Sequence, residues 1–197
     1  MELINNLVEY FTKLLQDGGL IFGILLILLE SVIPALPLGV FVALNINAYG
    51  IILGIIVSWL STCLGCYLSF LLFSLFSNRF LNRMEHKKKL KKIIAKMRTI
   101  NFSNLVVLIA LPFTPAFAIN IAAGLVGLDK RKFLVALLTG KIFMISFWGL
   151  VGKSLIESLT DISSLIIAAV LIIIAYFLSK LISKKMKIEW WRYIWII

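Results

Sequence analysis

Two ionisable residues of opposite charge lie inside long apolar stretches of the chain: Glu30 within Leu20–Ala48 and Lys141 within Phe133–Val151. A charge at bilayer depth is costly and marks a functional candidate. At a helical rise of 1.5 Å per residue, both lie roughly 12 to 16 Å into their stretches. We expect the two side chains to pair. The pair is either a structural lock, or a switch in which a phosphate competes for Lys141 and Glu30 then accepts a proton.

Uncharged polar side chains accompany these charges. Asn45, Asn47, Thr114 and Asn120 add hydrogen-bond donors and acceptors within apolar surroundings. Together with Glu30 and Lys141 they predict a polar path for a lipid headgroup, in which Asn45, Thr114 and Asn120 contact the substrate. Asn120 has a second interpretation, as a cap for a broken helix.

The other reactive residues do not form a catalytic or metal-binding pattern. Cys63 and Cys66 form a C-x-x-C motif in the middle of an apolar span, and the single histidine, His86, lies in a distant basic segment. Redox chemistry or half of a metal site would need a second pair of ligands. Small-residue packing on a helix is the preferred interpretation. We therefore expect no enzyme activity, no metal and no cofactor.

The four prolines of the chain form two Pro-x-x-Pro elements, Pro34 with Pro37 and Pro112 with Pro115. Proline breaks a helix because it lacks the amide donor. In hydrocarbon such a break is tolerated only where protein or a water-filled cavity covers it. Two breaks in corresponding halves point to a transport site built from discontinuous segments, and each following helix would begin with free amides suited to phosphate. Alternatively, the prolines only kink two spanning helices.

The composition is that of a membrane protein. Hydrophobic residues make up 61% of the 197 residues, and the mean hydropathy is +1.05. Each span needs about 20 apolar residues, so the chain is long enough for several. At intervals of three and four residues, Gly54, Ser58 and Ser61 begin a stripe of small residues on the span at 51–76 that favours close helix packing.

These patterns predict an all-α integral membrane protein with two inverted re-entrant hairpins, each followed by a transmembrane helix, and a final transmembrane helix. The expected segments are an interfacial amphipathic helix (1–17), a membrane domain (18–182) and a basic aromatic tail (183–197). Within the membrane domain we expect hairpin 1 at about 19–48, a span at 51–76, a basic interfacial helix at 79–102, hairpin 2 at about 105–128, and spans at 133–151 and 162–182.

The net charge of +11 is carried by segments beside the apolar runs. Loops rich in Lys and Arg stay on the cytoplasmic side, so residues 79–98, Lys130–Lys132 and the tail are expected inside. The partners predicted by this charge are anionic lipid headgroups rather than nucleic acid. The N-terminus is then outside if the first hairpin is re-entrant, and inside if that segment spans. The sequence leaves open whether the protein forms a homo-oligomer.

At Glu30-Ser-Val-Ile-Pro34-x-x-Pro37, and again at Pro112-Phe-Thr-Pro115-x(4)-Asn120-x(3)-Gly124, the chain resembles the DedA family of the SNARE-associated Golgi protein superfamily, which shares the VTT domain. The resemblance runs from about residue 18 to about residue 152. It implies a fold of two inverted re-entrant hairpins in the bacterial cytoplasmic membrane. It also implies movement of undecaprenyl phosphate or another phospholipid between leaflets, as a flippase or scramblase.

Two positions depart from the family pattern. Ile109 stands where many members have Arg, and Leu38-Gly39 where many have an acid. Those groups are thought to serve phosphate recognition or proton coupling. Two other functions remain as alternatives: a proton-coupled or ion-coupled transporter of a small solute, and a membrane-organising protein that transports nothing.

Overall fold

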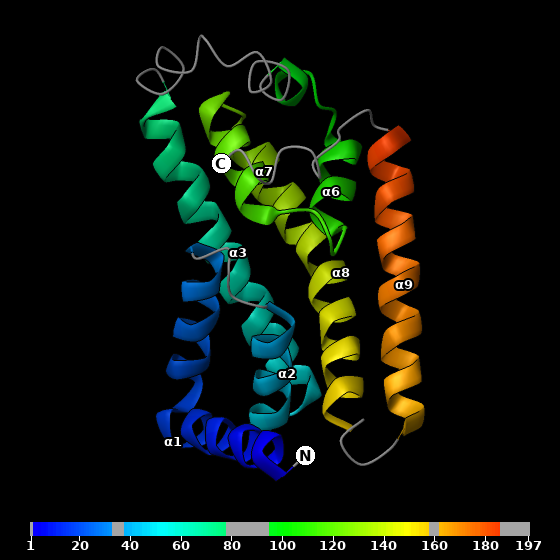
Figure 1. Ribbon diagram of the computed structural model, residues 1–197. Coiled ribbons are helices and arrows are strands. Elements are labelled where there is room, and N and C mark those ends of the chain that lie inside the picture. The colour runs from blue at the N-terminus through cyan, green and yellow to red at the C-terminus, as the bar shows by residue number, and fades with distance from the viewer. Residues whose placement is uncertain (1, 33–37, 78–94, 158–161, 186–197) are drawn as a thin grey trace.

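The computed structural model describes residues 2–32, 38–77, 95–157 and 162–185, and all regular structure in these ranges is helical. The first Pro-x-x-Pro element, Pro34 to Pro37, and most of the expected basic helix at 79–102 lie outside the described residues. The helices, labelled as in Figure 1, are α1 (Glu2–Val32), α2 (Leu38–Tyr49), α3 (Ile51–Leu75), α6 (Phe102–Ala110), α7 (Ala116–Leu125), α8 (Lys130–Glu157) and α9 (Ile162–Lys185).

The first helix changes direction at Gly19, whose φ of 63° lies in the left-handed region that glycine tolerates. Polar contacts hold the stretch up to and including this kink to the end of α2. Asn47 donates to Thr12 Oγ1 at 2.9 Å, and Gln16 donates to the Ala48 carbonyl at 3.4 Å. The Tyr49 hydroxyl lies 2.8 Å from the Gly19 carbonyl oxygen. The first part of α1 therefore lies across one end of the molecule, as Figure 1 shows in dark blue.

The helices divide into three long ones and two antiparallel pairs of shorter segments. In Figure 1, α3, α8 and α9 run between the two ends of the molecule. The part of α1 after Gly19 and the following α2 occupy the lower half, whereas α6 and α7 occupy the upper half. α2 packs against α1, α3 and α8, while α6 packs against α8 and α7 against α3. The two short pairs are thus held by the same long helices from opposite ends.

Two glycines allow these helices to approach closely. A Cβ added at Gly54 of α3 would lie 2.6 Å from Ile46 Cα of α2. One added at Gly124 of α7 would lie 2.6 Å from the Phe70 carbonyl oxygen of α3. Both glycines therefore sit where one backbone touches another, the packing mode that small residues favour in membranes.

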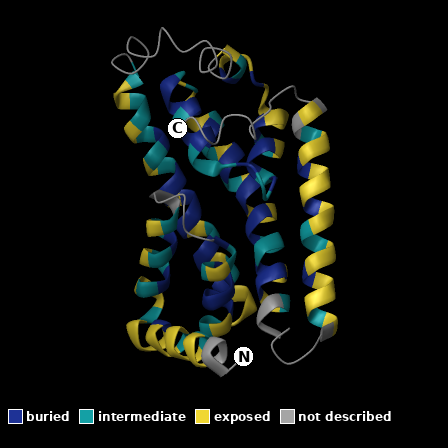
Figure 2. Ribbon diagram, viewed as in Figure 1, coloured by how far each residue is buried: buried dark blue, intermediate teal, exposed yellow. Residues whose placement is uncertain are grey.

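The core consists of two clusters of buried side chains, one for each short pair. The upper cluster includes Phe70 and Phe133, whose rings stack at 4.2 Å, while the lower one includes Ile27, Val42 and Ile145. Trp59 packs against both clusters. Figure 2 shows buried residues facing inward between the helices. The core is therefore continuous from one end of the molecule to the other.

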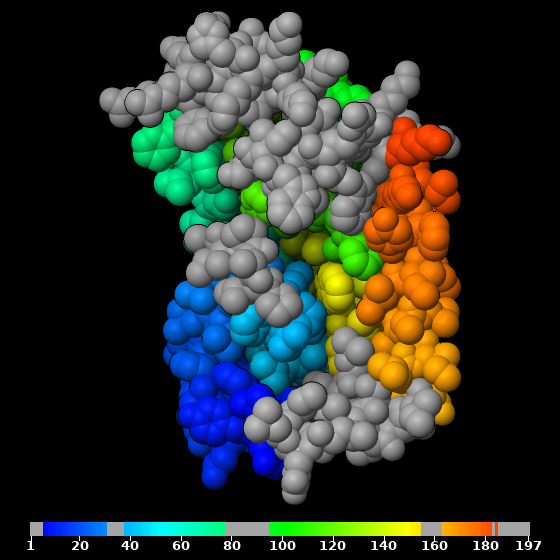
Figure 3. Space-filling model, in the orientation of Figure 1, coloured from blue at the N-terminus to red at the C-terminus, as the bar shows by residue number. Residues whose placement is uncertain are grey.

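The outer surface is apolar. α9 exposes Ile166, Ile174 and Phe177, each more than half accessible, along the edge that it forms in Figures 2 and 3. Exposed apolar area of this extent marks contact with another apolar phase. Among the described residues, four helical stretches are long and apolar enough to cross a membrane: Asn6–Glu30, Ile51–Leu75, Lys130–Ser154 and Ser163–Ile182. The prediction of an all-helical membrane protein is confirmed.

Candidate functional site

Lys141 lies in the middle of α8 and is 1% exposed, although it carries a charge. Its ammonium group donates to the Met144 sulfur at 3.4 Å, and a thioether is only a weak acceptor. Among the described residues, no carboxylate oxygen lies within 4.0 Å of this ammonium group. The three N–H donors of Lys141 are therefore poorly satisfied by the protein itself.

Glu30 lies near the end of α1, and this helix contacts α2, α3 and, less extensively, α7. Its side chain is half-buried and lies within electrostatic reach of Lys141. The structure thus brings the two opposite charges into one region, but they interact through space without a direct ion pair.

Cys63 of α3 lies beside the same lysine. Its thiol is 3.9 Å from the Leu137 carbonyl oxygen and within electrostatic reach of Lys141. Cys66 is 1% exposed, and neither cysteine is in a disulfide. In the part of the chain that the structure describes, no three His, Cys, Asp or Glu side chains come together as metal ligands. Both cysteines pack in the upper core cluster.

The predicted polar side chains fall into different environments. Asn45 of α2 donates to Ser58 Oγ of α3 at 3.0 Å, so it ties two helices together. Thr114 is buried in the segment that joins α6 to α7. Asn47 is exposed and bonded to Thr12 near the end of α2. Thr114 lies between the end of α6 and the start of α7, and Gly140, next to Lys141 in the sequence, packs against Ile109 near the end of α6.

Asn120 does not cap a helix, so that interpretation is wrong. The N-cap residue of α7 is Pro115, with no side-chain cap, and Asn120 lies in the second turn. Its side chain is 2% exposed, and none of the described residues supplies a hydrogen-bond acceptor for its Nδ2. A buried amide donor without a partner is rare and marks a place where a ligand or water can bind.

α2 and α7 each begin directly after the second proline of a Pro-x-x-Pro element, at Leu38 and at Ala116. Each helix therefore directs its amino-terminal end toward the middle of the molecule (Figure 1). The positive end of a helix dipole and its first amides favour an anion.

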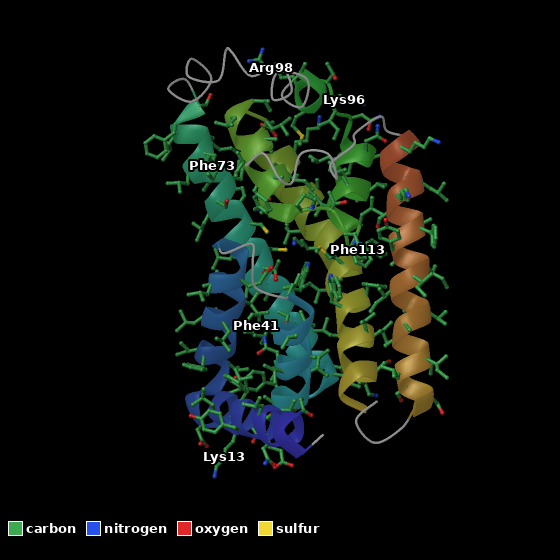
Figure 4. All side chains as sticks on the ribbon, in the orientation of Figure 1. Lys13, Phe41, Phe73, Lys96, Arg98 and Phe113 are labelled. Carbon is green, nitrogen blue, oxygen red and sulfur yellow. The ribbon has the colours of Figure 1, made fainter. Side chains whose placement is uncertain are left out.

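Trp148 of α8 is a residue that the sequence reasoning missed. Its Nε1 is buried and has no acceptor within the described part of the chain. Its ring lies against Gly39, where an added Cβ would be 2.7 Å from the Trp148 Cε3. The centroid of the same ring lies 6.0 Å from that of the Phe113 ring. Figure 4 shows Phe113 beside α8. One signal was available: Trp148 follows Lys141 by seven residues, which places both on one face of a helix.

The chain resembles known proteins over most of its length. Residues 33–154 match the family model of the VTT domain. A Bacillus subtilis (strain 168) protein named uncharacterized membrane protein YhjE is 30% identical over 185 residues, which cover 92% of this chain and 89% of that protein. No solved structure matches the chain significantly. The VTT match includes both Pro-x-x-Pro elements and Lys141, and Glu30 lies just before it.

Proposed function

This chain belongs to the VTT domain family, and on that premise we propose that it moves a phosphate-bearing lipid between the two leaflets of a membrane. Undecaprenyl phosphate and phospholipids are the substrate candidates. The observation that carries the proposal is the buried ammonium of Lys141, whose hydrogen-bond partner is a methionine sulfur. A phosphate supplies the charge and the acceptor oxygens that this group lacks.

The two short helix pairs act in this proposal as re-entrant hairpins that enter the bilayer from opposite faces, with the Pro-x-x-Pro elements at their tips. Their lengths support this. After Gly19, α1 rises about 20 Å, and α2, α6 and α7 rise about 18, 14 and 15 Å. The hydrocarbon core is about 30 Å thick. None of the four segments is therefore long enough to cross it, although Asn6–Glu30 would be if it were straight.

The headgroup would cross between the hairpins while its hydrocarbon chains remain in lipid. A polar group in hydrocarbon without partners costs several kcal/mol. Lys141, the amide of Asn120 and the amino-terminal end of α7 are donors that offset this cost at mid-depth. The barrier to crossing then falls without any covalent step. When a phosphate binds Lys141, Glu30 loses its electrostatic partner and is free to accept a proton.

One observation also favours a second candidate. A half-buried acid within electrostatic reach of a buried cation is an arrangement suited to proton coupling, so a proton-coupled transporter of a small anionic solute uses the same residues. The two candidates differ in what moves. A lipid translocase transfers headgroups between leaflets, whereas a solute transporter changes the contents or the pH of the vesicle lumen.

Purified protein reconstituted in liposomes tests the proposal. We expect faster transfer of polyprenyl phosphate or phosphatidylglycerol between leaflets than in protein-free liposomes, measured as the accessibility of the headgroup to an impermeant reagent. The Lys141→Gln variant should be slower even where it folds, because it removes the buried cation. If the wild-type protein transfers no phosphate-bearing lipid while it moves a solute or protons, the second candidate replaces the first.

A further inference from the structure

The indole N–H of Trp148 is buried and has no acceptor among the residues that the structure describes. The indole nitrogen is a donor only, so it needs an acceptor from elsewhere. Trp59 of α3 shows the usual arrangement, because its Nε1 donates to the Leu138 carbonyl oxygen at 3.0 Å. Two half-buried tryptophans therefore lie at α8: Trp59, which reaches it from α3 and has its N–H satisfied, and Trp148, which belongs to it and does not.

The unsatisfied N–H lies on the same face of α8 as the buried lysine. The Lys141 ammonium turns toward Met144, which is one turn closer to Trp148. Side chains on a helix lean toward its amino-terminal end, so the Trp148 ring leans back toward Met144. About 6 Å of helix axis separates Met144 from Trp148. A phosphate group that accepts one hydrogen bond of about 2.9 Å from each of two donors spans a comparable distance between those donors.

The Trp148 ring also lies between the start of α2 and the segment that joins α6 to α7. It contacts Gly39, in the first turn of α2, and Phe113, between Pro112 and Pro115. The Phe113 ring in turn lies 6.0 Å from that of Tyr176 on α9. Trp148 therefore links the first turn of α2 to the segment between α6 and α7.

We propose that Trp148 is a specificity-determining residue that donates its indole N–H to an oxygen of the phosphate held by Lys141. This inference rests on the proposed function and adds to it a second donor and a ligand class, the phosphate oxyanion of a lipid headgroup. An ionised oxygen accepts a stronger hydrogen bond than a neutral hydroxyl does. Trp148 therefore favours phosphate-bearing lipids over neutral ones.

The test compares Trp148→Phe with the matched control Trp59→Phe. Phenylalanine keeps an aromatic ring but removes the N–H. In liposomes, Trp148→Phe should slow the transfer of polyprenyl phosphate by about tenfold, the usual value of one hydrogen bond to a charged group. Transfer of neutral diacylglycerol should not change. Because no protein hydrogen bond is lost, its unfolding midpoint in detergent should stay close to that of the wild type.

We expect the Trp59→Phe control to lose stability but to keep its rate of lipid transfer. Trp59→Phe leaves the Leu138 carbonyl without its partner, so its unfolding midpoint should fall. Transfer per folded molecule should stay at the wild-type rate. If Trp148→Phe does not fold, Gly39→Ala replaces it, since the added Cβ would displace the Trp148 ring while keeping its N–H. That variant should also lower the ratio of polyprenyl phosphate to diacylglycerol transfer.

A binding titration separates this inference from the proposed function. Dihexanoyl phosphatidic acid, a short-chain lipid phosphate, is titrated into detergent-solubilised protein, with inorganic phosphate as a parallel ligand. Trp148→Phe should bind the lipid phosphate about tenfold more weakly than the wild type does. Wild-type affinity in this variant, or no binding by the wild type, overturns the inference even if liposome transfer is observed. Tighter binding of inorganic phosphate than of the lipid phosphate overturns the lipid assignment.

Discussion

Lys141 is the residue on which the electrostatics of this molecule depend. A charge at the centre of a membrane helix costs about 2.5–3.5 kcal/mol on insertion scales, and simulations give more. The Met144 sulfur offsets little of this cost, because a thioether is a weak acceptor. Glu30 acts on Lys141 only through space. The lysine is therefore retained at a cost to stability, which is expected of a residue that binds something.

A double-mutant cycle measures how strongly the two charges interact. Glu30→Gln leaves the fully buried ammonium without its electrostatic partner, so it should destabilise the protein more than Lys141→Gln does. The double variant should show a coupling free energy of about 0.5–3 kcal/mol in denaturant unfolding in detergent. A control cycle with Lys180→Gln, on exposed α9, should be additive. Additive losses for Glu30 and Lys141 would mean that the two charges do not interact.

At the scale of elements, α3 organises the packing. It contacts α1, α2, α7 and α8, so it holds both short helix pairs. Its own Gly54 admits α2, and Gly124 of α7 lies against its backbone at Phe70. Where two backbones are in contact, no flexible side chain can move aside to make room for an added methyl group. The helix spacing near the site therefore depends on the absence of a single methyl group at each position.

Two glycine-to-alanine substitutions distinguish a glycine that contacts the backbone of another helix from one that contacts a flexible side chain. In Gly124→Ala the new Cβ would lie 2.6 Å from a carbonyl oxygen of α3, which must move, so we expect a loss of about 1–3 kcal/mol. In the control, Gly149→Ala, the nearest atom is the Ile46 Cδ1 at 3.0 Å, the end of a flexible side chain. Unfolding in detergent should show a much smaller loss for the control. Equal losses would contradict the close approach of α7 to α3.

At the scale of the whole molecule, the two ends differ in charge. Lys96 and Arg98 lie at the upper end in Figure 4, where α8 also begins with Lys130-Arg131-Lys132. The lower end carries the first part of α1, in which Glu9 and Asp17 accompany Lys13. Because basic segments remain in the cytoplasm, the upper end is expected to be cytoplasmic. The first helix pair would then enter from the outside and the second from the inside.

Thiol labelling in intact cells tests this orientation. In a Cys63→Ser, Cys66→Ser background, Lys13→Cys should react with an impermeant maleimide, and Arg98→Cys should react only after the cells are lysed. Both positions are exposed, so access depends on the side of the membrane. Labelling of Arg98→Cys but not of Lys13→Cys would invert the molecule. Labelling of neither in intact cells would place both ends in the cytoplasm and make the first segment a span.

Hydropathy and helix length are local properties of a segment, so the amino-acid sequence was sufficient to predict the membrane class and the all-helical structure. The same sequence singled out Glu30 and Lys141, since a charge inside an apolar run is visible without a fold. The folded arrangement was needed to show that these two charges lie within electrostatic reach without a direct ion pair, and that Asn120 does not cap α7. It also placed Trp148 against Gly39 and Phe113. These contacts join residues that are far apart along the chain, so helix packing sets them and no local pattern records them.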